Sequence, residues 1–157
     1  GFVRLDGGAG HPFLFWSNTM TNDTIIYLEI LADDQRVNHT AKLFGVHFPM
    51  LLEPTIYTMA DKLSADYTGG YWDLFTLSNG AFYMAPHADH PFSVASMNGF
   101  EGSMSADAVG ITVCLFAYSQ LSFGGDALAE VCAEQYHLLR EFAIDHAEVR
   151  AIMAATD

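Results

Sequence analysis

Residues 63–86 read LSADYTGGYWDLFTLSNGAFYMAP, and this stretch decides the fold because its hydrophobic period changes within it. From Pro54 to the start of this stretch, apolar side chains recur at three- and four-residue intervals, which predicts a helix over residues 54–65. After a glycine pair, aromatic residues partly alternate over 71–78, Asn79-Gly80 is a strong hairpin signal, and 81–85 returns as a second strand. The stretch therefore predicts a helix end, a glycine joint and a β-hairpin.

Neighbouring segments complete an α+β pattern around this hairpin. A second pair, Asn98-Gly99, predicts another tight turn, and we expect both hairpins in one small antiparallel sheet. Ser105 is typical of a helix N-cap, and the apolar residues after it indicate a helix buried at the centre of the domain. TIIYLEIL, residues 24–31, favours extended backbone, although its length also fits a helical turn. We expect strands over residues 71–78, 81–85, 92–97 and 100–103, and helices over residues 34–44, 54–65, 105–121 and 126–153.

The composition indicates one globular domain with an acidic surface. Only 16% of the 157 residues are charged, against about 25% in an average domain, which argues against extensive disorder. A net charge of −13 opposes binding to nucleic-acid phosphates. Neither a membrane-length apolar run nor an export signal is found, so we expect a cytoplasmic protein. In that compartment, Cys114 and Cys132 are expected to be buried free thiols.

Motifs for catalysis are absent, which favours a protein that is not an enzyme and has no catalytic residues or cofactors. The sequence contains no G-x-S-x-G elbow, no Walker loop and no G-x-G-x-x-G after a strand. HADH, residues 87–90, has metal-ligand residue types, but it stands beside two prolines, and the other histidines show no metal-site spacing. We therefore predict a polar loop and no metal site. The alternative is a small metal-binding protein or hydrolase that uses the His87–His90 loop with Asp66 and Tyr67.

Two sets of residues are candidates for binding a protein partner. On the predicted C-terminal helix, at about 100° per residue, one arc collects six acidic residues: Asp126, Glu130, Glu134, Glu141, Asp145 and Glu148. Such an arc is commonly a solvated face, and the sharper hypothesis is a docking surface for a basic partner. The second set comprises Asp66, Tyr67, Tyr71 and Asp73. Most aromatic residues of this region are expected to build the core, which leaves an exposed minority for binding.

The stretch at residues 63–86 also resembles the signature of the ArdB/KlcA antirestriction family of plasmids and other mobile elements. Two further segments agree with this resemblance. DQRVNHTAKLFG, residues 34–45, resembles the first helix of the family, and SADAVGITVCLFAYSQLSF, residues 105–123, resembles its buried helix after the sheet. Because the N-terminal portion of the family is variable, we expect residues 1–30 to be a variable or partly flexible segment and residues 31–157 to be a single antirestriction-type domain.

The resemblance implies a compact α/β domain that protects incoming DNA by counteracting type I restriction-modification systems, and it does not imply an enzyme. Duplex DNA carries one negative charge per about 1.7 Å, so nineteen acids spread over the whole chain are too sparse for a DNA mimic. We therefore hypothesise that the protein acts on a protein partner. The expected partner is the type I restriction-modification complex or a host factor that controls it.

Overall fold

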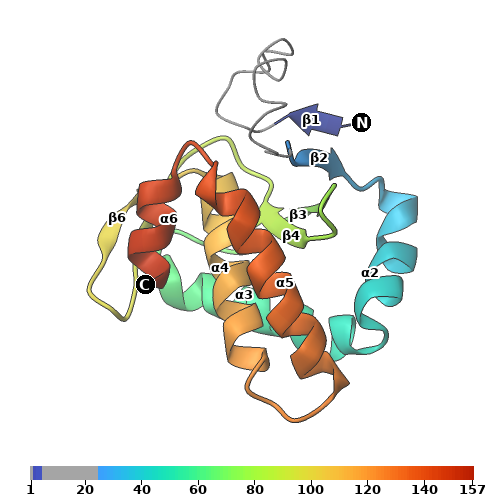
Figure 1. The fold of residues 1–157 in the computed structure, drawn as a ribbon. Helices are drawn as coiled ribbons and strands as arrows, with labels where there is room; N and C mark the ends of the chain where they lie inside the picture. Colours follow the sequence, from blue (N-terminus) through green and yellow to red (C-terminus); the bar gives the residue numbers. More distant parts are fainter. Residues whose placement is uncertain (1, 5–24) are drawn as a thin grey trace, which may run out of the picture.

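The computed structural model describes residues 2–4 and 25–157 and confirms the predicted α+β fold (Figure 1). The predicted variable segment at residues 1–30 lies mostly outside the described residues. A 3₁₀ turn, η1, and a π-helical segment, η2, accompany the helices and strands. In chain order the elements are β1 (Phe2–Arg4), β2 (Tyr27–Ile30), η1 (Asp33–Gln35), α2 (Arg36–Phe44), η2 (Phe48–Leu52), α3 (Glu53–Leu63), β3 (Trp72–Leu77), β4 (Phe82–Pro86), β5 (Phe92–Ala95), β6 (Glu101–Met104), α4 (Ala106–Leu121), α5 (Ala127–Ile144) and α6 (Val149–Thr156).

The main sheet contains four antiparallel strands in the order β1-β2-β3-β4. The predicted hairpin at residues 71–85 forms its β3 and β4, which pair with Phe75 opposite Tyr83. The stretch TIIYLEIL supplies β2, where Ile30 pairs with Phe75. The expectation of extended backbone at residues 24–31 is therefore confirmed for Tyr27–Ile30.

The second hairpin does not join this sheet, so the prediction of a single sheet was wrong in this respect. β5 and β6 form a separate two-stranded ribbon that packs against α4, and β6 also meets α6. Two prolines explain the separation, because Pro86 ends β4, Pro91 precedes β5, and neither can donate a ladder hydrogen bond. The chain between them turns away and gives the ribbon an environment of its own.

The predicted helices are confirmed except for the last one. Residues 34–44 form η1 and α2, residues 54–65 correspond to α3, and residues 105–121 correspond to α4 with Ser105 as its N-cap. Residues 126–153 are two helices rather than one, because α5 ends at Ile144 and α6 begins at Val149. The break has a tertiary cause: the Glu148 carboxylate accepts hydrogen bonds from the backbone N–H and the hydroxyl of Ser105, which draws the chain toward the start of α4.

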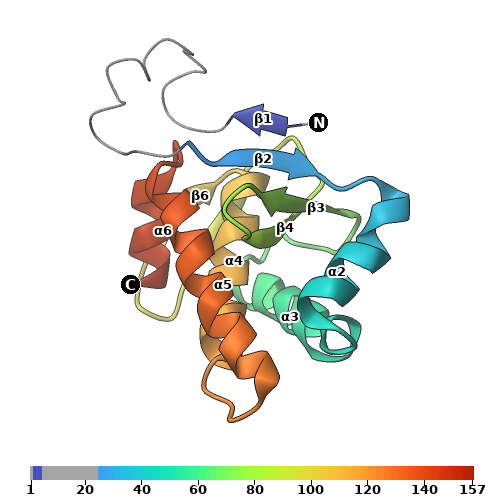
Figure 2. The ribbon, with the colours of Figure 1, turned by 45° about the vertical axis from the view of Figure 1, so that its right-hand side comes forward.

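The core is built around α4, which packs against β4, α3, α5 and α6 (Figures 1 and 2). Eleven of its sixteen residues are buried, as its apolar sequence predicted. Gly110 lets α4 approach the sheet closely, since a Cβ atom there would lie 2.3 Å from Ala85 Cβ. Cys114 and Cys132 are buried free thiols, as expected. Among the described residues, none of the helices combines the length and apolar character that a bilayer crossing requires.

The outer edge of β4 is closed by side chains instead of another strand. Gln135 Oε1 accepts the Phe82 N–H at 2.8 Å, and the Tyr118 hydroxyl donates to the Phe82 carbonyl at 2.7 Å. Cys114 Sγ accepts the Met84 N–H at 3.5 Å. Because an open edge offers unpaired backbone groups to other strands, these helix side chains protect β4 from further pairing.

Candidate interaction site

Tyr71 is the centre of an exposed cluster that joins three separate elements. Its side chain follows the glycine joint directly and is 53% exposed. The hydroxyl donates to Asp33 Oδ1 at 2.6 Å, which raises the pKa of Tyr71, and the Arg36 Cζ atom lies 4.6 Å from the ring centroid. The His87 ring meets the Tyr71 ring edge-on, with the centroids 6.0 Å apart. An aromatic side chain held in this way is exposed yet already ordered, as an interface anchor requires.

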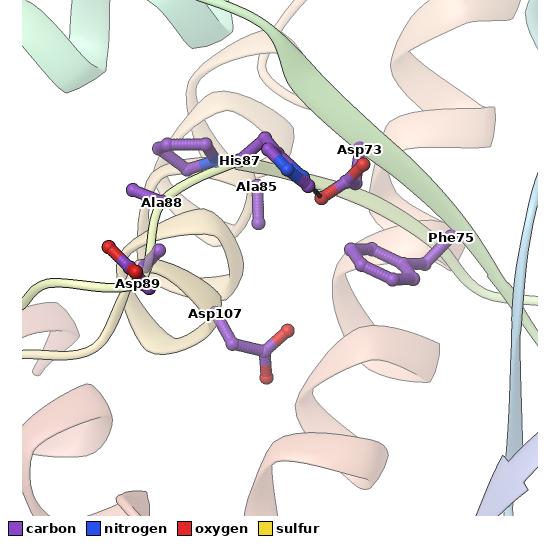
Figure 3. Close-up of a pocket in the computed structure, with 9 residues that line it drawn as sticks. Asp73, Phe75, Ala85, His87, Ala88, Asp89 and Asp107 are labelled. Atoms are coloured by element: carbon purple, nitrogen blue, oxygen red, sulfur yellow. Dashed lines mark hydrogen bonds and ion pairs between the residues drawn. The ribbon is translucent and has the colours of Figure 1, made fainter.

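Asp73 connects this cluster to a pocket of about 500 Å³ beside the start of α4. His87 Nδ1 lies 2.8 Å from Asp73 Oδ2, as the dashed line in Figure 3 indicates. Asp89 and Asp107 also line the pocket, and Phe75 forms one wall. Within the described part of the chain, no lysine or arginine lines this pocket, so its field favours a positively charged group.

A hydrogen-bond network lies beside the pocket and links β4, α4 and the α5–α6 joint. Asp107 accepts from the Tyr83 hydroxyl at 2.7 Å and from His146 Nε2 at 2.8 Å. His146 Nδ1 accepts the Glu148 N–H at 2.9 Å, which places the ring proton of neutral histidine on Nε2. Burial is the main cause that raises the pKa of Tyr83 well above 10, with Asp107 adding to it, so its hydroxyl remains a donor.

This network brings serine, histidine and aspartate together without forming a nucleophile site. The Ser105 hydroxyl is bonded to the Glu148 carboxylate and not to His146. Both nitrogens of His146 are occupied by other partners, so no imidazole is free to activate the serine. The arrangement therefore fixes the α5–α6 joint and offers no positive evidence of catalysis.

Sequence reasoning missed this network because its partners are far apart in the chain. Asp107 and His146 are separated by 39 residues, and neither belongs to a recognisable motif. The single local signal was the N-cap position of Ser105, whose hydroxyl accepts the Ala108 N–H at 3.1 Å.

The other two predicted residues of the central stretch hold the fold together. Asp66 Oδ2 accepts the Ser93 N–H at 2.8 Å and so ties the end of α3 to β5. The Tyr67 hydroxyl accepts from Trp72 Nε1 at 2.9 Å. Of the four candidates in this stretch, the structure thus brings Tyr71 and Asp73 together with His87 and engages the other two in internal bonds.

The HADH loop contributes His87 to the Tyr71 cluster and directs His90 elsewhere. His90 Nδ1 lies 3.1 Å from the Pro91 carbonyl oxygen. Across residues 2–4 and 25–157, no three His, Cys, Asp or Glu side chains are grouped so that they could hold a metal ion.

The acidic arc divides into engaged and free carboxylates. Asp126 N-caps α5 by accepting the Ala129 N–H at 2.9 Å, and Glu148 is bonded to Ser105. Glu141 Oε1 accepts from Asn79 Nδ2 at 2.9 Å. The remaining three, Glu130, Glu134 and Asp145, are exposed, and their carboxylates make no hydrogen bond or ion pair with another described residue.

Comparison with known proteins shows one consistent family. A family model described as antirestriction protein matches residues 65–157. An antirestriction protein KlcA from Escherichia coli is 37% identical over 140 residues, which cover 87% of this chain and 99% of that protein. A second KlcA from Escherichia coli is 40% identical over 132 residues, covering 81% and 90%.

A solved structure of the KlcA and ArdB proteins has the same fold. It aligns with a TM-score of 0.79 at 35% identity and covers 87% of this chain and 98% of that chain. The KlcA and ArdB proteins are reported to have a novel fold and antirestriction activity against type I DNA restriction systems in vivo but not in vitro.

Proposed function

The chain belongs to the antirestriction protein family, and from this premise we propose that it protects incoming mobile-element DNA by counteracting type I restriction-modification systems of the host. The likeness to the KlcA and ArdB structure, which covers 87% of this chain at a TM-score of 0.79, carries the proposal. Because the alignment also covers 98% of that chain, it is a likeness of whole domains.

We propose that the protein acts through a protein partner, either the restriction complex or a host factor that controls it. The reported activity of the solved relatives in vivo but not in vitro favours a route that needs a further component of the cell. The acidic composition supports a protein target as well, since a net charge of −13 repels nucleic-acid phosphates.

Charge density argues against DNA mimicry as the mechanism. α5 has 18 residues, and at about 1.5 Å per residue it is about 27 Å long. Duplex DNA of that length carries about 16 negative charges, at one per about 1.7 Å. α5 carries only three acidic residues, Glu130, Glu134 and Glu141, and the last of these is bonded to Asn79.

We assign the partner contact to the free carboxylates of the acidic arc, with Tyr71 and Asp73 as a second contact. Glu130 and Glu134 are one helical turn apart on the exposed face of α5, so a basic surface can meet both at once. Asp126, Glu141 and Glu148 contribute charge to the same region while they hold internal hydrogen bonds.

Charge reversal at two positions tests the proposal. In the double variant Glu130→Lys/Glu134→Lys we expect protection to be lost, so that unmodified phage plates on a type I restricting host as poorly as without the protein. The matched control is Asp61→Lys/Glu101→Lys, which makes the same charge change at two exposed sites on other elements. Full protection by the α5 variant, or equal loss in the control, would contradict the assignment to α5.

The second contact is tested in the same assay with Tyr71→Ala. The exposed ring leaves no buried cavity when it is removed, so the variant is expected to fold. We expect a partial loss of protection, because one anchor is removed while the acidic face remains. Unchanged plating with this variant would restrict the contact to α5.

A further inference from the structure

Arg36, whose guanidinium lies against the Tyr71 ring, also lines a second candidate recognition feature. An apolar groove of about 430 Å³ is lined by residues of α2 and of the segment that contains η2, together with Leu74 of β3. Val37, Val46 and Phe48 are apolar residues of its lining. A concave apolar site of this size is large enough for one or two side chains of another molecule.

Three apolar residues in or next to the groove lining are strongly exposed. Val37 is 76% exposed, Val46 is 66% exposed, and Met50, in η2, is 72% exposed. Single exposed apolar residues are common on protein surfaces, but Val37 and Val46 both line one concave site, and Met50 directly follows the lining residue Pro49. Such a group forms a patch that typically marks an interaction surface.

The groove is shaped by unusual backbone on its η2 side. Gly45 ends α2 with φ 61° and ψ −146°, a conformation that is almost restricted to glycine, and this turn folds the chain back toward α2. The segment that follows, η2, is π-helical. Such segments make up well under 1% of residues in proteins and are frequent at functional sites.

Arg36 supplies a fixed positive charge to the lining of the groove. Its side chain lines the groove and is held between the Tyr71 ring, 4.6 Å from its Cζ, and Asp33 Oδ1, 3.5 Å from its Nε. Arg36 Nε is buried without a hydrogen-bond partner among the described residues, while 20% of the side-chain surface remains exposed. The other charged residue of the lining, Glu53, already accepts a hydrogen bond from the Tyr57 hydroxyl at 3.2 Å.

We propose that this groove binds a short amphipathic segment of a partner protein. An apolar side chain of that segment lies between Val37 and Val46, and a neighbouring aspartate or glutamate pairs with Arg36. Charge complementarity selects this occupant, since Arg36 is the one cation that lines the groove within the described residues, in a molecule with only six Lys and Arg. The inference takes from the proposed function only the existence of a protein partner.

The test is selection of short random peptides displayed on phage against the purified protein, followed by affinity measurements with an enriched synthetic peptide. We expect enriched sequences to share a large apolar residue close to Asp or Glu. Val37→Glu should weaken binding of such a peptide by about tenfold or more, because it places a carboxylate on the apolar wall. Arg36→Gln should preserve the apolar preference and remove the preference for an acidic neighbour.

The matched control is Met97→Glu, which makes a similar apolar-to-acid change at a 99% exposed residue in the turn between β5 and β6. We expect it to bind the peptide like the unmodified protein. Enrichment of basic peptides, or equal enrichment on the Val37→Glu variant, would overturn the proposal. Self-association of the unmodified protein that Val37→Glu abolishes would assign the groove to a second copy and would also overturn it. Because none of these readouts involves restriction, their failure is distinct from failure of the proposed function.

Discussion

The two hairpins of this protein use the same turn in two different settings. Gly80 and Gly99 each adopt φ 95°, a conformation that favours glycine. In each turn the asparagine Oδ1 accepts the backbone N–H two residues further on, at 3.0 Å from both Asn79 and Asn98. At the level of the turn, the β3–β4 and β5–β6 hairpins are therefore nearly identical.

They differ in what surrounds them. Every residue of β4 is buried, whereas β5 alternates between buried and exposed residues and β6 is mostly exposed. Asn79 Nδ2 donates to the Leu138 carbonyl of α5, and Asn98 Nδ2 donates to the Ala154 carbonyl of α6. An Asn-Gly turn thus specifies a hairpin, while packing against a helix decides whether that hairpin is core or periphery.

The largest expected effect is a loss of stability from replacing a glycine that packs against the β3–β4 hairpin, compared with a glycine in the β5–β6 hairpin. Gly110→Ala in α4 would place a Cβ 2.3 Å from Ala85 Cβ and 2.5 Å from the Met84 carbonyl oxygen, so α4 must move away from β4. We expect a loss of about 3 kcal/mol in the free energy of unfolding, despite the better helix propensity of alanine. Urea denaturation monitored by circular dichroism measures it.

The matched change in the other hairpin is Gly102→Ala in β6. Its Cβ would lie 2.8 Å from Phe100 Cζ, the end of a partly exposed side chain that can rotate away. We expect a loss below about 1 kcal/mol. Equal losses in the two variants would contradict the distinction between a core hairpin and a peripheral one.

The next effect is a loss of stability in alkaline solution, to which two α4 side chains packed against the β3–β4 hairpin contribute. Burial raises the pKa of the Cys114 thiol to about 12 and raises that of Tyr118 well above 10, and both groups contact β4. Because these groups ionise more readily in the unfolded chain, their contribution is complete below about pH 9 and decreases as pH rises from there toward 12. The urea midpoint should therefore fall steadily above pH 9.

Tyr118→Phe tests whether ionisation of this tyrosine causes part of the alkaline loss of stability. The variant loses the hydrogen bond to the Phe82 carbonyl and should be less stable at neutral pH, but its stability should fall less steeply above pH 10. The β5–β6 hairpin contains neither tyrosine nor cysteine, so Asn98→Ala should leave the slope unchanged. A slope unaffected by Tyr118→Phe would show that the alkaline loss has another origin.

The features that could be predicted from the sequence are those with local causes. Both Asn-Gly turns, the N-cap at Ser105 and the buried character of α4 depend on neighbouring residues, and all four were found. The separation of the β5–β6 ribbon from the main sheet could be foreseen only in part. Pro86 and Pro91 flank the connection between β4 and β5 and disfavour strand pairing there, but they do not indicate where the ribbon packs instead. The closing of the β4 edge by Gln135 has no sequence signal at all, since it is 53 residues from Phe82.

The candidate site shows the same division between local and long-range causes. The amphipathic period placed Glu130 and Glu134 on an exposed face correctly, since that period is a local property. The break before α6 was missed because it depends on the bonds of Glu148 with Ser105, 43 residues away. Likewise, the surroundings of Tyr71, with Asp33 and His87 brought from other elements, required the fold itself.

One hydrogen bond from each turn asparagine ties its turn to a helix carbonyl. Asn79→Asp and Asn98→Asp keep the acceptor of the turn but replace the donor by an oxygen that faces a helix carbonyl. We expect Asn79→Asp to lower the free energy of unfolding by about 2 kcal/mol, because the new charge also faces Glu141, and Asn98→Asp by about 1 kcal/mol. Denaturation in urea gives both values.

Hydrogen exchange then distinguishes where each bond acts. α6 has only eight residues, and the Asn98 bond to Ala154 lies near its C-terminal end, so Asn98→Asp should accelerate exchange of α6 amides while those of α4 change little. Asn79→Asp should instead accelerate exchange throughout β4 and α5, because its bonds join the core hairpin to the longest helix of the described chain. If α6 amides exchange at the same rate in both variants, the ribbon is not what holds α6, and its attachment comes from its packing against α4 and from the bonds of Glu148 at the α5–α6 joint.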